Sequence, residues 1–390
     1  MAQHVDTQAP AILPFWTGVR TLQSLLPSQD RLVLHAGPPF RDVQELPAAI
    51  RNSVLVGVLY EGWAADLAQA QTLLDQGGVQ LAPAQDYGLV VPLAGVATPS
   101  MCVIEVSDAN QPEHKKYSVL NEGMQWCTRL GIFADEMVPH LRWLHQDFGA
   151  SLAQHFKEPV DLSPILQASL LNGDDGHART LHASRLLADI IVSWGMNEER
   201  STGFLYGAMA WALNYWMAAS ALILAYQKPA DGSDAIVKVG GNGLRFGLQL
   251  ASSRHWLVVD APAIAGNPDP GNEQAHALGT LGDSAVVDFV GLGGQCLDLA
   301  ASSARNLQAF LPADYVNRQS RFLKTPLSFL AGRAGVTDFA QVLASDTGPL
   351  VLLGMIDGAG KRGRIGGGVA SVDAQLLRAL KEWQNETTVV

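Results

Sequence analysis

Apolar runs and helical repeats alternate along the first 150 residues of the chain. The stretches from Leu32 to His35 and from Val54 to Tyr60 are continuous apolar runs that predict strands. The Ala/Leu-rich stretch that follows predicts a helix, which a Gly-Gly pair can end as a C-terminal cap. Residues 88–106 predict two more strands around a Pro/Gly turn, and a helix is expected from Asn121. This alternation is typical of an α/β domain.

The middle of the chain has a helical pattern between two polar linkers, residues 155–164 and 228–234. Its segment from Gly203 to Tyr226 contains no charged residue, and about 20 such residues suffice to cross a bilayer. The alternative is a buried central helix. The Ala and Gly content, Asn214 in its middle and the lack of a strongly basic flank favour the buried helix.

Strands and glycine-rich turns alternate again after the second linker. Apolar segments at residues 236–251, 282–294 and 350–356 are each interrupted or followed by a glycine-rich turn. We therefore predict an α/β protein of mixed, multi-domain organisation with two α/β units and a helical middle region. The predicted division is an N-terminal α/β domain at residues 1–155, a helical region at 156–230 and a C-terminal α/β domain with Gly-rich loops at 231–390.

Composition excludes several classes of function. A chain of 390 residues with 48% hydrophobic content can bury a large core. A net charge of -11 without a Lys/Arg block argues against partners such as nucleic acid or an anionic membrane surface, and favours a small-molecule substrate. The three cysteines are far apart, which argues against a disulfide framework or a thiolate zinc site. The N-terminus lacks the features of a signal peptide, so we expect a cytoplasmic protein.

The densest polar cluster is NGDDGHART, residues 172–180. In a structural interpretation, Asp174 or Asp175 caps a helix, and the spacings from Asp174 to His177 and from Asp175 to Arg179 place each pair on one helical face. In a functional interpretation the same side chains form a catalytic cluster. Gly176 supports function, because a glycine disfavours a helix interior and permits close approach of another group to the backbone.

Glycine-rich turns follow several predicted strands and can bind an anion through exposed backbone N–H groups. In the last of them, residues 358–368, we expect an anion site made by Gly360, Arg362, Arg364 and Gly366. The segment GAGKRG satisfies G-x-G-x-x-G, but too little chain follows to complete a dinucleotide-binding unit, and the spacing of a P-loop is absent.

Two further places carry candidate polar groups. In GDSAVVD, residues 282–288, Asp283 and Ser284 either bind substrate or simply cap a helix and fill a turn. His35 and Glu61 follow apolar runs, at the end where ligands approach open sheets. The sequence contains neither G-x-S-x-G nor H-E-x-x-H, so it gives no local support for a serine hydrolase or a zinc protease.

Several segments together resemble one family, the AllG (YlbE-like) family, which includes a subunit of bacterial oxamate carbamoyltransferase. They occur in family order across nearly the whole chain and are LHAGPPF (34–40), LYEGWA (59–64), PLAGVATPSM (92–101), LNEG (120–123), NGDDGHART (172–180), GGNGLRFG (240–247), GDSAVVDFVGLGG (282–294) and RIGGG (364–368). In the Gly-Asp-Glu-x-His-x-Arg motif of the family, Gly173, Asp174, His177 and Arg179 match, and Asp175 stands in the Glu position.

The resemblance implies transfer of a carbamoyl group between carbamoyl phosphate and an amide nitrogen such as that of oxamate. It also implies a homo-oligomer or partner subunits, and we expect no cofactor and no metal. The expected catalytic residues are Asp174, His177 and Arg179, with His177 as the base and Asp174 as its partner. We expect Arg179 and Asn242 to polarise the carbonyl, and Arg362 and Arg364 to bind phosphate. The expected substrate-binding residues are Glu61, Asn121, Glu122, Asn242, Arg245, Asp283, Ser284 and Asp288.

This chain departs from the family pattern at several polar positions. The family's histidine-rich segment before the PLAG-like turn reads AQDYGLVV here, and its Asn-Asp-His before the apolar helix has become Ala208, Met209 and Ala210. Asp288 stands for a Glu, and two arginines, at 245 and 364, stand for an acid and a Gln. These changes indicate a different acceptor. Two alternatives stay open, a diverged biosynthetic enzyme that forms or cleaves an amide-type bond and a non-catalytic subunit of a multi-subunit transferase.

Overall fold

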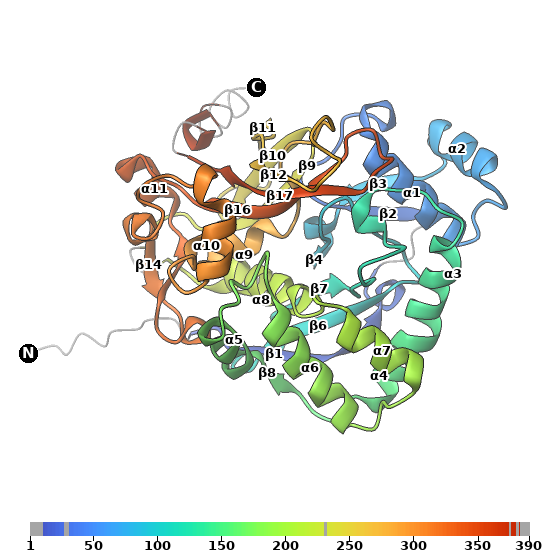
Figure 1. Ribbon diagram of the computed structural model, residues 1–390, viewed down its shortest axis with the longest axis horizontal. Coiled ribbons are helices and arrows are strands. Elements are labelled where there is room, and N and C mark those ends of the chain that lie inside the picture. The colour runs from blue at the N-terminus through green and yellow to red at the C-terminus, as the bar shows by residue number, and fades with distance from the viewer. Residues whose placement is uncertain (1–10, 27–30, 230–231, 374–375, 380–381, 383–390) are drawn as a thin grey trace, which may run out of the picture.

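The protein combines helices with several small sheets, which confirms the predicted α/β class (Figure 1). The computed structural model describes residues 11–26, 31–229, 232–373, 376–379 and 382. The predicted boundary between residues 230 and 231 lies outside the described residues, as do the first ten residues, which carried most of the argument about a signal peptide. The division into three regions stays a prediction.

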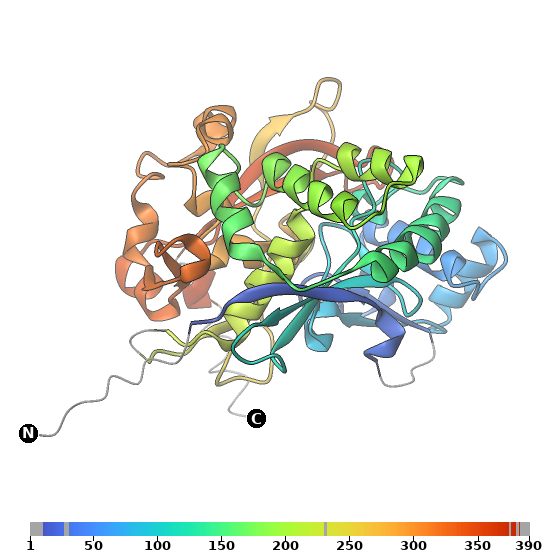
Figure 2. The ribbon, with the colours of Figure 1, turned by 90° about the horizontal axis from the view of Figure 1, so that it is seen from below.

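The helices form the outer layers and one central element. They are α1 (Ala48–Tyr60), α2 (Leu67–Asp75), α3 (Met137–Arg142), α4 (Gly149–His155), α5 (Leu162–Leu171), α6 (Leu181–Ser193), α7 (Glu199–Gly207), α8 (Leu213–Tyr226), α9 (Ala285–Val290), α10 (Ala301–Leu307) and α11 (Phe339–Ser345). A π-helical segment, Trp143–Phe148, joins α3 to α4. Figure 2 shows α5, α6 and α7 side by side on one face of the molecule.

Within the described residues, the strands form five sheets. They are β1 (Pro14–Thr21), β2 (Leu32–His35), β3 (Gln80–Pro83), β4 (Leu89–Val90), β5 (Val96–Ala97), β6 (Cys102–Asp108), β7 (Lys115–Val119), β8 (Val160–Asp161), β9 (Ile236–Asn242), β10 (Arg245–Leu250), β11 (Leu257–Asp260), β12 (Ala265–Pro268), β13 (Leu281–Gly282), β14 (Leu323–Pro326), β15 (Ala334–Thr337), β16 (Leu350–Ile356) and β17 (Arg364–Ser371). Their orders are β4-β7-β6-β1-β8, β11-β10-β9-β13, β12-β17-β16, β14-β15 and β3-β2-β5. Most pairs are antiparallel.

Helix α8 lies at the centre of the fold, where it packs against β6, β7, β9 and α9 (Figure 1). Every residue from Leu213 to Leu224 is buried, which confirms the buried helix within the uncharged segment. The segment is not one helix, because α7 ends at Gly207 and a turn precedes α8. Within the described part of the chain, no helix combines the length and the apolar character that crossing a membrane requires.

Two of the predicted elements are wrong, while the strand at Leu32 to His35 is confirmed as β2. The apolar run from Val54 to Tyr60 is helical and belongs to α1, because a helix buried on most sides has the same continuous apolar pattern as a buried strand. The helix expected from Asn121 is absent, and only a 3-10 turn at Thr128–Leu130 forms there. Gly123 has a φ of 86° and Trp126 one of 55°, values that no α-helix contains.

One buried carboxylate connects the N-terminal loops with the C-terminal sheet. Asp283 accepts hydrogen bonds from the backbone N–H of Gly37 at 2.9 Å and of Val91 at 3.0 Å, and from Nε2 of Gln85 at 2.7 Å. Gln85 also bonds the backbone of Val239 in β9. Burial raises the pKa of Asp283 to about 7, against the lowering effect of these donors. Asp283 therefore fixes the loops that surround the site described next.

Candidate functional site

The site centres on an ion pair between His177 and Asp288. Nδ1 of His177 lies 2.6 Å from Oδ2 of Asp288, and the two side chains are 4% and 0% exposed. Nε2 of His177 forms no hydrogen bond with the described residues. This atom is also not fully buried. The carboxylate thus orients the imidazole, and the nitrogen on the far side of the ring stays accessible.

The surrounding backbone holds Asp288 in place. Oδ1 of Asp288 accepts hydrogen bonds from the N–H of Gly294 at 2.9 Å and of Leu352 at 3.2 Å. A side chain at Gly293 is excluded, because a Cβ there would overlap the Asp288 carboxylate and lie 3.0 Å from the Cβ of His177. The glycine-rich turn at residues 291–294 therefore serves to pack the backbone tightly around the pair.

The charges of the pair alter both pKa values. Burial by itself lowers the pKa of His177, but the charge and hydrogen bond of Asp288 outweigh burial and raise it above the ordinary value. Burial raises the pKa of Asp288, which His177 and the two backbone donors counteract only in part. A histidine with an accessible nitrogen and an orienting carboxylate is suited to accept and return a proton near neutral pH.

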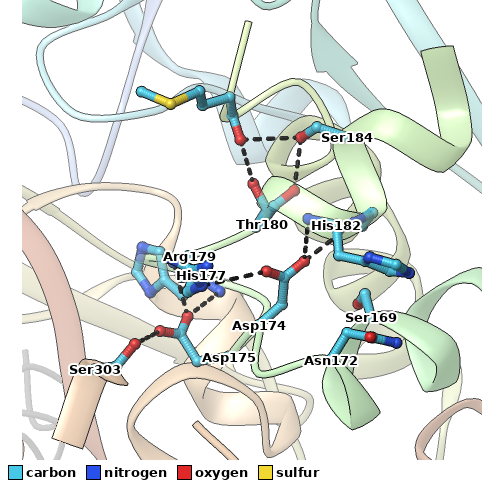
Figure 3. A network of polar contacts seen from close by, with 12 residues as sticks. Ser169, Asn172, Asp174, Asp175, His177, Arg179, Thr180, His182, Ser184 and Ser303 are labelled. Atoms are coloured by element: carbon cyan, nitrogen blue, oxygen red, sulfur yellow. Dashed lines mark hydrogen bonds and ion pairs between the residues drawn. The ribbon is translucent and has the colours of Figure 1, made fainter. Parts of the chain in front are cut away.

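The segment that carries His177 is a turn between α5 and α6, shown in Figure 3. Oδ1 of Asp175 accepts from the backbone N–H of His177 at 2.7 Å and of Arg179 at 3.1 Å, and its Oδ2 accepts from Oγ of Ser303 at 2.6 Å. The expected helical spacing within residues 172–180 is wrong, because Gly173 and Gly176 have φ values of 84° and 82°. The group that approaches Gly176 closely is Leu292.

Asp174 does not contact His177, so the expected Asp174–His177 pairing is wrong. Its Oδ2 accepts from the backbone N–H of His182 at 2.9 Å and of Ala183 at 3.1 Å, and it thereby caps α6 from eight residues upstream (Figure 3). Its Oδ1 has one neighbour of opposite charge, Nε of Arg179 at 3.7 Å. The side chain of Arg179 is 42% exposed, so its guanidinium can still contact a ligand.

Ser284 lies one turn before Asp288, at the N-terminal end of α9, and shares a helical face with it. Its hydroxyl forms no hydrogen bond to the described residues and is absent from the fully buried atoms without a partner. It is also 3.3 Å from the position of a Cβ on Gly282. Ser284 is therefore a predicted side chain, one helical turn from Asp288, whose hydroxyl forms no hydrogen bond to the described residues.

The other predicted substrate-binding residues hold loops together. Asn242 bonds the carbonyl of Pro38 and the backbone N–H groups of two residues that follow it. The carboxylate of Glu61 accepts from the backbone and hydroxyl of Ser100. Three more residues show the same behaviour, with contacts from Asn121 to Ala210 and Gly123, from Glu122 to Thr128, and from Arg245 to Glu45. These side chains shape the site through the loops that they connect.

The predicted C-terminal anion site binds an anion that belongs to the chain itself. The carboxylate of Asp357 accepts from the backbone N–H groups of residues 359, 361 and 362, in the turn that contains Gly360. Arg362 bonds Gly271 and Asn272. Arg364 pairs with Asp269 at 2.7 Å and is 47% exposed. Gly366 lies in β17, against the backbone of β12.

Sequence reasoning missed two parts of the site. Ser303 supports Asp175 across 128 residues, and the N–H of Leu352 supports Asp288 across 64 residues. No local spacing could indicate either contact.

A surface groove of about 460 Å³ also lies between α5 and α6, but its lining is mainly apolar and Asp189 is its sole charged residue. Among the described residues, no group of His, Cys, Asp and Glu could hold a metal ion.

Comparison with known proteins identifies a family that this sequence matches. The sequence model of the family described as "Oxamate carbamoyltransferase subunit AllG" matches residues 79–284. The chain is 25% identical to the protein of that name from Escherichia coli K12, over 95% of this chain and 94% of that protein. It is 24% identical to the uncharacterized protein YahG of the same organism, over 68% of this chain and 58% of YahG.

A solved structure has the same fold. A conserved protein of unknown function from Enterococcus faecalis V583 superposes with a TM-score of 0.84 at 22% identity, over 96% of this chain and 94% of that chain. The family match covers more than half of the sequence and includes the His177 segment, Asn242 and Asp283. The chain belongs to the AllG family.

Proposed function

We propose that this protein transfers a carbamoyl group between carbamoyl phosphate and an amide or amine acceptor, with His177 as the proton acceptor. The observation that carries the proposal is the buried His177–Asp288 pair, whose second imidazole nitrogen stays free. The name of the relative that the chain matches over 95% of its length supports the reaction class. The replaced polar positions at residues 208–210 support an acceptor other than oxamate itself.

The reaction needs one proton transfer and one group transfer. Nε2 of His177 accepts a proton from the acceptor nitrogen as that nitrogen attacks the carbamoyl carbon. A new N–C bond forms, the C–O bond to phosphate breaks and phosphate leaves with the bonding electrons. Arg179, which is partly exposed and next to the pair in sequence, is suited to stabilise the negative charge that develops on the carbonyl oxygen.

A purified sample of the full chain tests this proposal. Carbamoyl phosphate is supplied with a panel of amides and amines, and both phosphate release and the carbamoylated product are measured. We expect product with at least one acceptor, and a loss of turnover of about a hundredfold or more in His177→Ala. His182→Ala is the matched control, because His182 is in the same segment and only its backbone contributes to the network.

The outcomes separate the three candidate functions. A carbamoylated acceptor formed by the isolated chain supports the transferase. Another amide-type product from the same panel of amides and amines supports a diverged amide-forming enzyme. No turnover with any acceptor, or equal turnover in wild type and His177→Ala, would contradict the proposal. The name of the relative as a subunit makes the non-catalytic subunit the principal rival.

A further inference from the structure

Arg129 has a guanidinium nitrogen that lacks a hydrogen-bond partner among the described residues. Its Nε is fully buried and has no hydrogen-bond partner among the described residues. Its Nη2 donates to the carbonyl of Gly123 at 2.6 Å and lies 3.5 Å from the sulfur of Met124. Arg318, which also has a buried and unpartnered Nε, lies 3.9 Å from the carboxylate of Asp314. In the described part of the chain, Arg129 forms no such ion pair.

Glu122 is a nearby acid in sequence, and it interacts with Arg129 through its charge without an ion pair between the two side chains. Both carboxylate oxygens of Glu122 are directed at Thr128, one at its backbone N–H and one at its hydroxyl at 2.7 Å. Burial of Glu122 raises its pKa to about 7, so it carries at most part of a charge near neutral pH. The guanidinium of Arg129 is partly buried and forms no ion pair with the described residues, which indicates that an anion from outside can complete this site.

Arg129 and His177 belong to one closed ring of contacts. On one side, the carbonyl of Arg129 accepts a hydrogen bond from the backbone N–H of Ala94. The preceding residue, Leu93, lies against Gly282, which is close to Ser284. Ser284 in turn precedes Asp288 by one helical turn. That side of the ring ends at the His177–Asp288 pair. The ring therefore includes both free hydroxyl and free imidazole groups of the candidate site.

The other side of the ring runs through the turn before α8. Oγ1 of Thr180 and Oγ of Ser184 donate to the carbonyl of Met209, at 3.3 Å and 3.0 Å. Nδ2 of Asn121 donates to the carbonyl of Ala210 at 2.8 Å, and Oδ1 of Asn121 accepts from Gly123, whose carbonyl binds Arg129. The residues that carry Arg129 and His177 thus surround a common region.

The loop next to Arg129 exposes large apolar side chains and contains a strained residue. Met124 is 45% exposed and Trp126 is 38% exposed, and Trp126 has a φ of 55°, which is strained for a bulky residue. Met209, across the ring, is 52% exposed. Movement of the flexible Met124 side chain would open the guanidinium to a ligand while the bond to Gly123 stays intact.

We propose that Arg129 binds the oxyanion of a substrate, a carboxylate or phosphate group, and so positions that substrate toward His177. The inference uses the proposed function only to name the anion. A carboxylate on the acceptor and the phosphate of the donor share this chemistry, because a guanidinium donates charge-assisted hydrogen bonds to either group. Arg129 then adds substrate recognition to a site whose other predicted cation is Arg179.

Binding measurements on the full chain test the inference without any need for turnover. Titration calorimetry is carried out with oxamate and, separately, with inorganic phosphate, on wild type, Arg129→Gln and Arg321→Gln. Glutamine keeps a donor for the carbonyl of Gly123 but removes the charge. Arg321 is the matched control, because it is an exposed arginine already paired with Asp314 at 2.7 Å. The unfolding temperature of each variant verifies its fold, and Arg129→Met, which also removes the charge, replaces Arg129→Gln if that variant does not fold.

We expect Arg129→Gln to weaken the binding of at least one probe by about tenfold or more, and Arg321→Gln to change neither. Weakened oxamate binding assigns the acceptor carboxylate, and weakened phosphate binding assigns the donor. Unchanged affinity for both probes in Arg129→Gln, or no binding of either probe by wild type, would overturn the inference. Intact, Arg129-dependent binding in a chain that transfers no carbamoyl group would remove the proposed function alone.

Discussion

Nδ1 of His177 lies 2.6 Å from Oδ2 of Asp288, although 111 residues separate them in the chain. The turn between α5 and α6 supplies the imidazole, and the middle of α9 supplies the carboxylate. Glycine backbone packs closely around the pair, and Nε2 of the imidazole forms no hydrogen bond with the described residues. The predictions below separate the residues that hold this arrangement from those that use it.

Replacement of Asp174 by alanine should affect stability and leave turnover nearly unchanged. Asp174 caps α6 through two backbone N–H groups and does not contact His177, so we expect a loss of about 1 kcal/mol in the free energy of unfolding. Urea denaturation measures this loss. Asp161→Ala at the start of α5 is a matched control with a similar loss, because Asp161 caps that helix. A hundredfold fall in turnover for Asp174→Ala at equal folded fraction would show that Asp174 takes part in the reaction.

Gly293→Ala should damage both stability and activity. Gly293 has a φ of 54°, and a Cβ there would press on Asp288 and His177. Gly332→Ala is the control, because Gly332 has a φ of 81° but no atom within 4 Å of the added Cβ. Both variants should lose about 1 kcal/mol of stability through backbone strain, and Gly293→Ala should lose more because its Cβ also overlaps the Asp288 carboxylate. Only Gly293→Ala should lower turnover as well, and equal turnover in the two variants would show that the position of the pair is not critical.

The sequence predicts elements best where turn residues mark their ends. β2 is followed at once by Gly37 and two prolines, and it was predicted correctly, as was β16 before its glycine-rich turn. The error at α1 has a physical cause, since a helix buried on most sides has no apolar stripe to distinguish it from a buried strand. The helix expected from Asn121 failed because side chains and positive φ values fix an irregular loop there.

The membership of the candidate site stays a prediction, but the structure pairs His177 with a residue other than the expected one. His177 and Asp288 both stood out in the sequence, but spacing within residues 172–180 indicated Asp174 as the partner. That inference assumed a helix, and the glycines at 173 and 176 prevent one. Contacts over more than 100 residues, such as Ser303 with Asp175, depend on how α9 and α10 pack against the turn. No local pattern encodes them.

The Asp283 connection should make stability depend on pH. Burial raises its pKa from 3.8 to about 7 in the folded protein, so the folded state holds this proton more tightly than the unfolded chain does. The resulting stabilisation is complete below about pH 4 and is lost as pH rises through 7. Asp283→Asn should therefore lower stability by about 1–3 kcal/mol at pH 5, through a lost acceptor, and by less at pH 8. Urea denaturation at both pH values checks this, and a larger loss at pH 8 would contradict it.

Phosphate binding at the C-terminal turn should depend on side chains alone. Asp357 occupies the backbone donors, so the part of any phosphate-induced shift of the unfolding temperature that arises at this turn depends on Arg362 and Arg364. The double substitution to alanine should reduce the shift, and Arg362→Ala should reduce it more than Arg364→Ala, because Arg364 already pairs with Asp269 whereas Arg362 contacts only Gly271 and Asn272. Thermal unfolding with and without phosphate measures the effect. An unchanged shift in the double variant would exclude this turn as an anion site.

The pH profile of kcat/KM for carbamoyl transfer, measured in wild type and Asp288→Asn, tests the role of His177 most directly. A proton acceptor must be neutral, so activity should fall as pH drops through the pKa of His177, which Asp288 holds above 6.5. Without that carboxylate, burial lowers this pKa, and the acid limb should move to lower pH while the maximum falls by about a hundredfold or more. An acid limb that stays at the same pH in Asp288→Asn would contradict the assignment of His177 as the base oriented by Asp288.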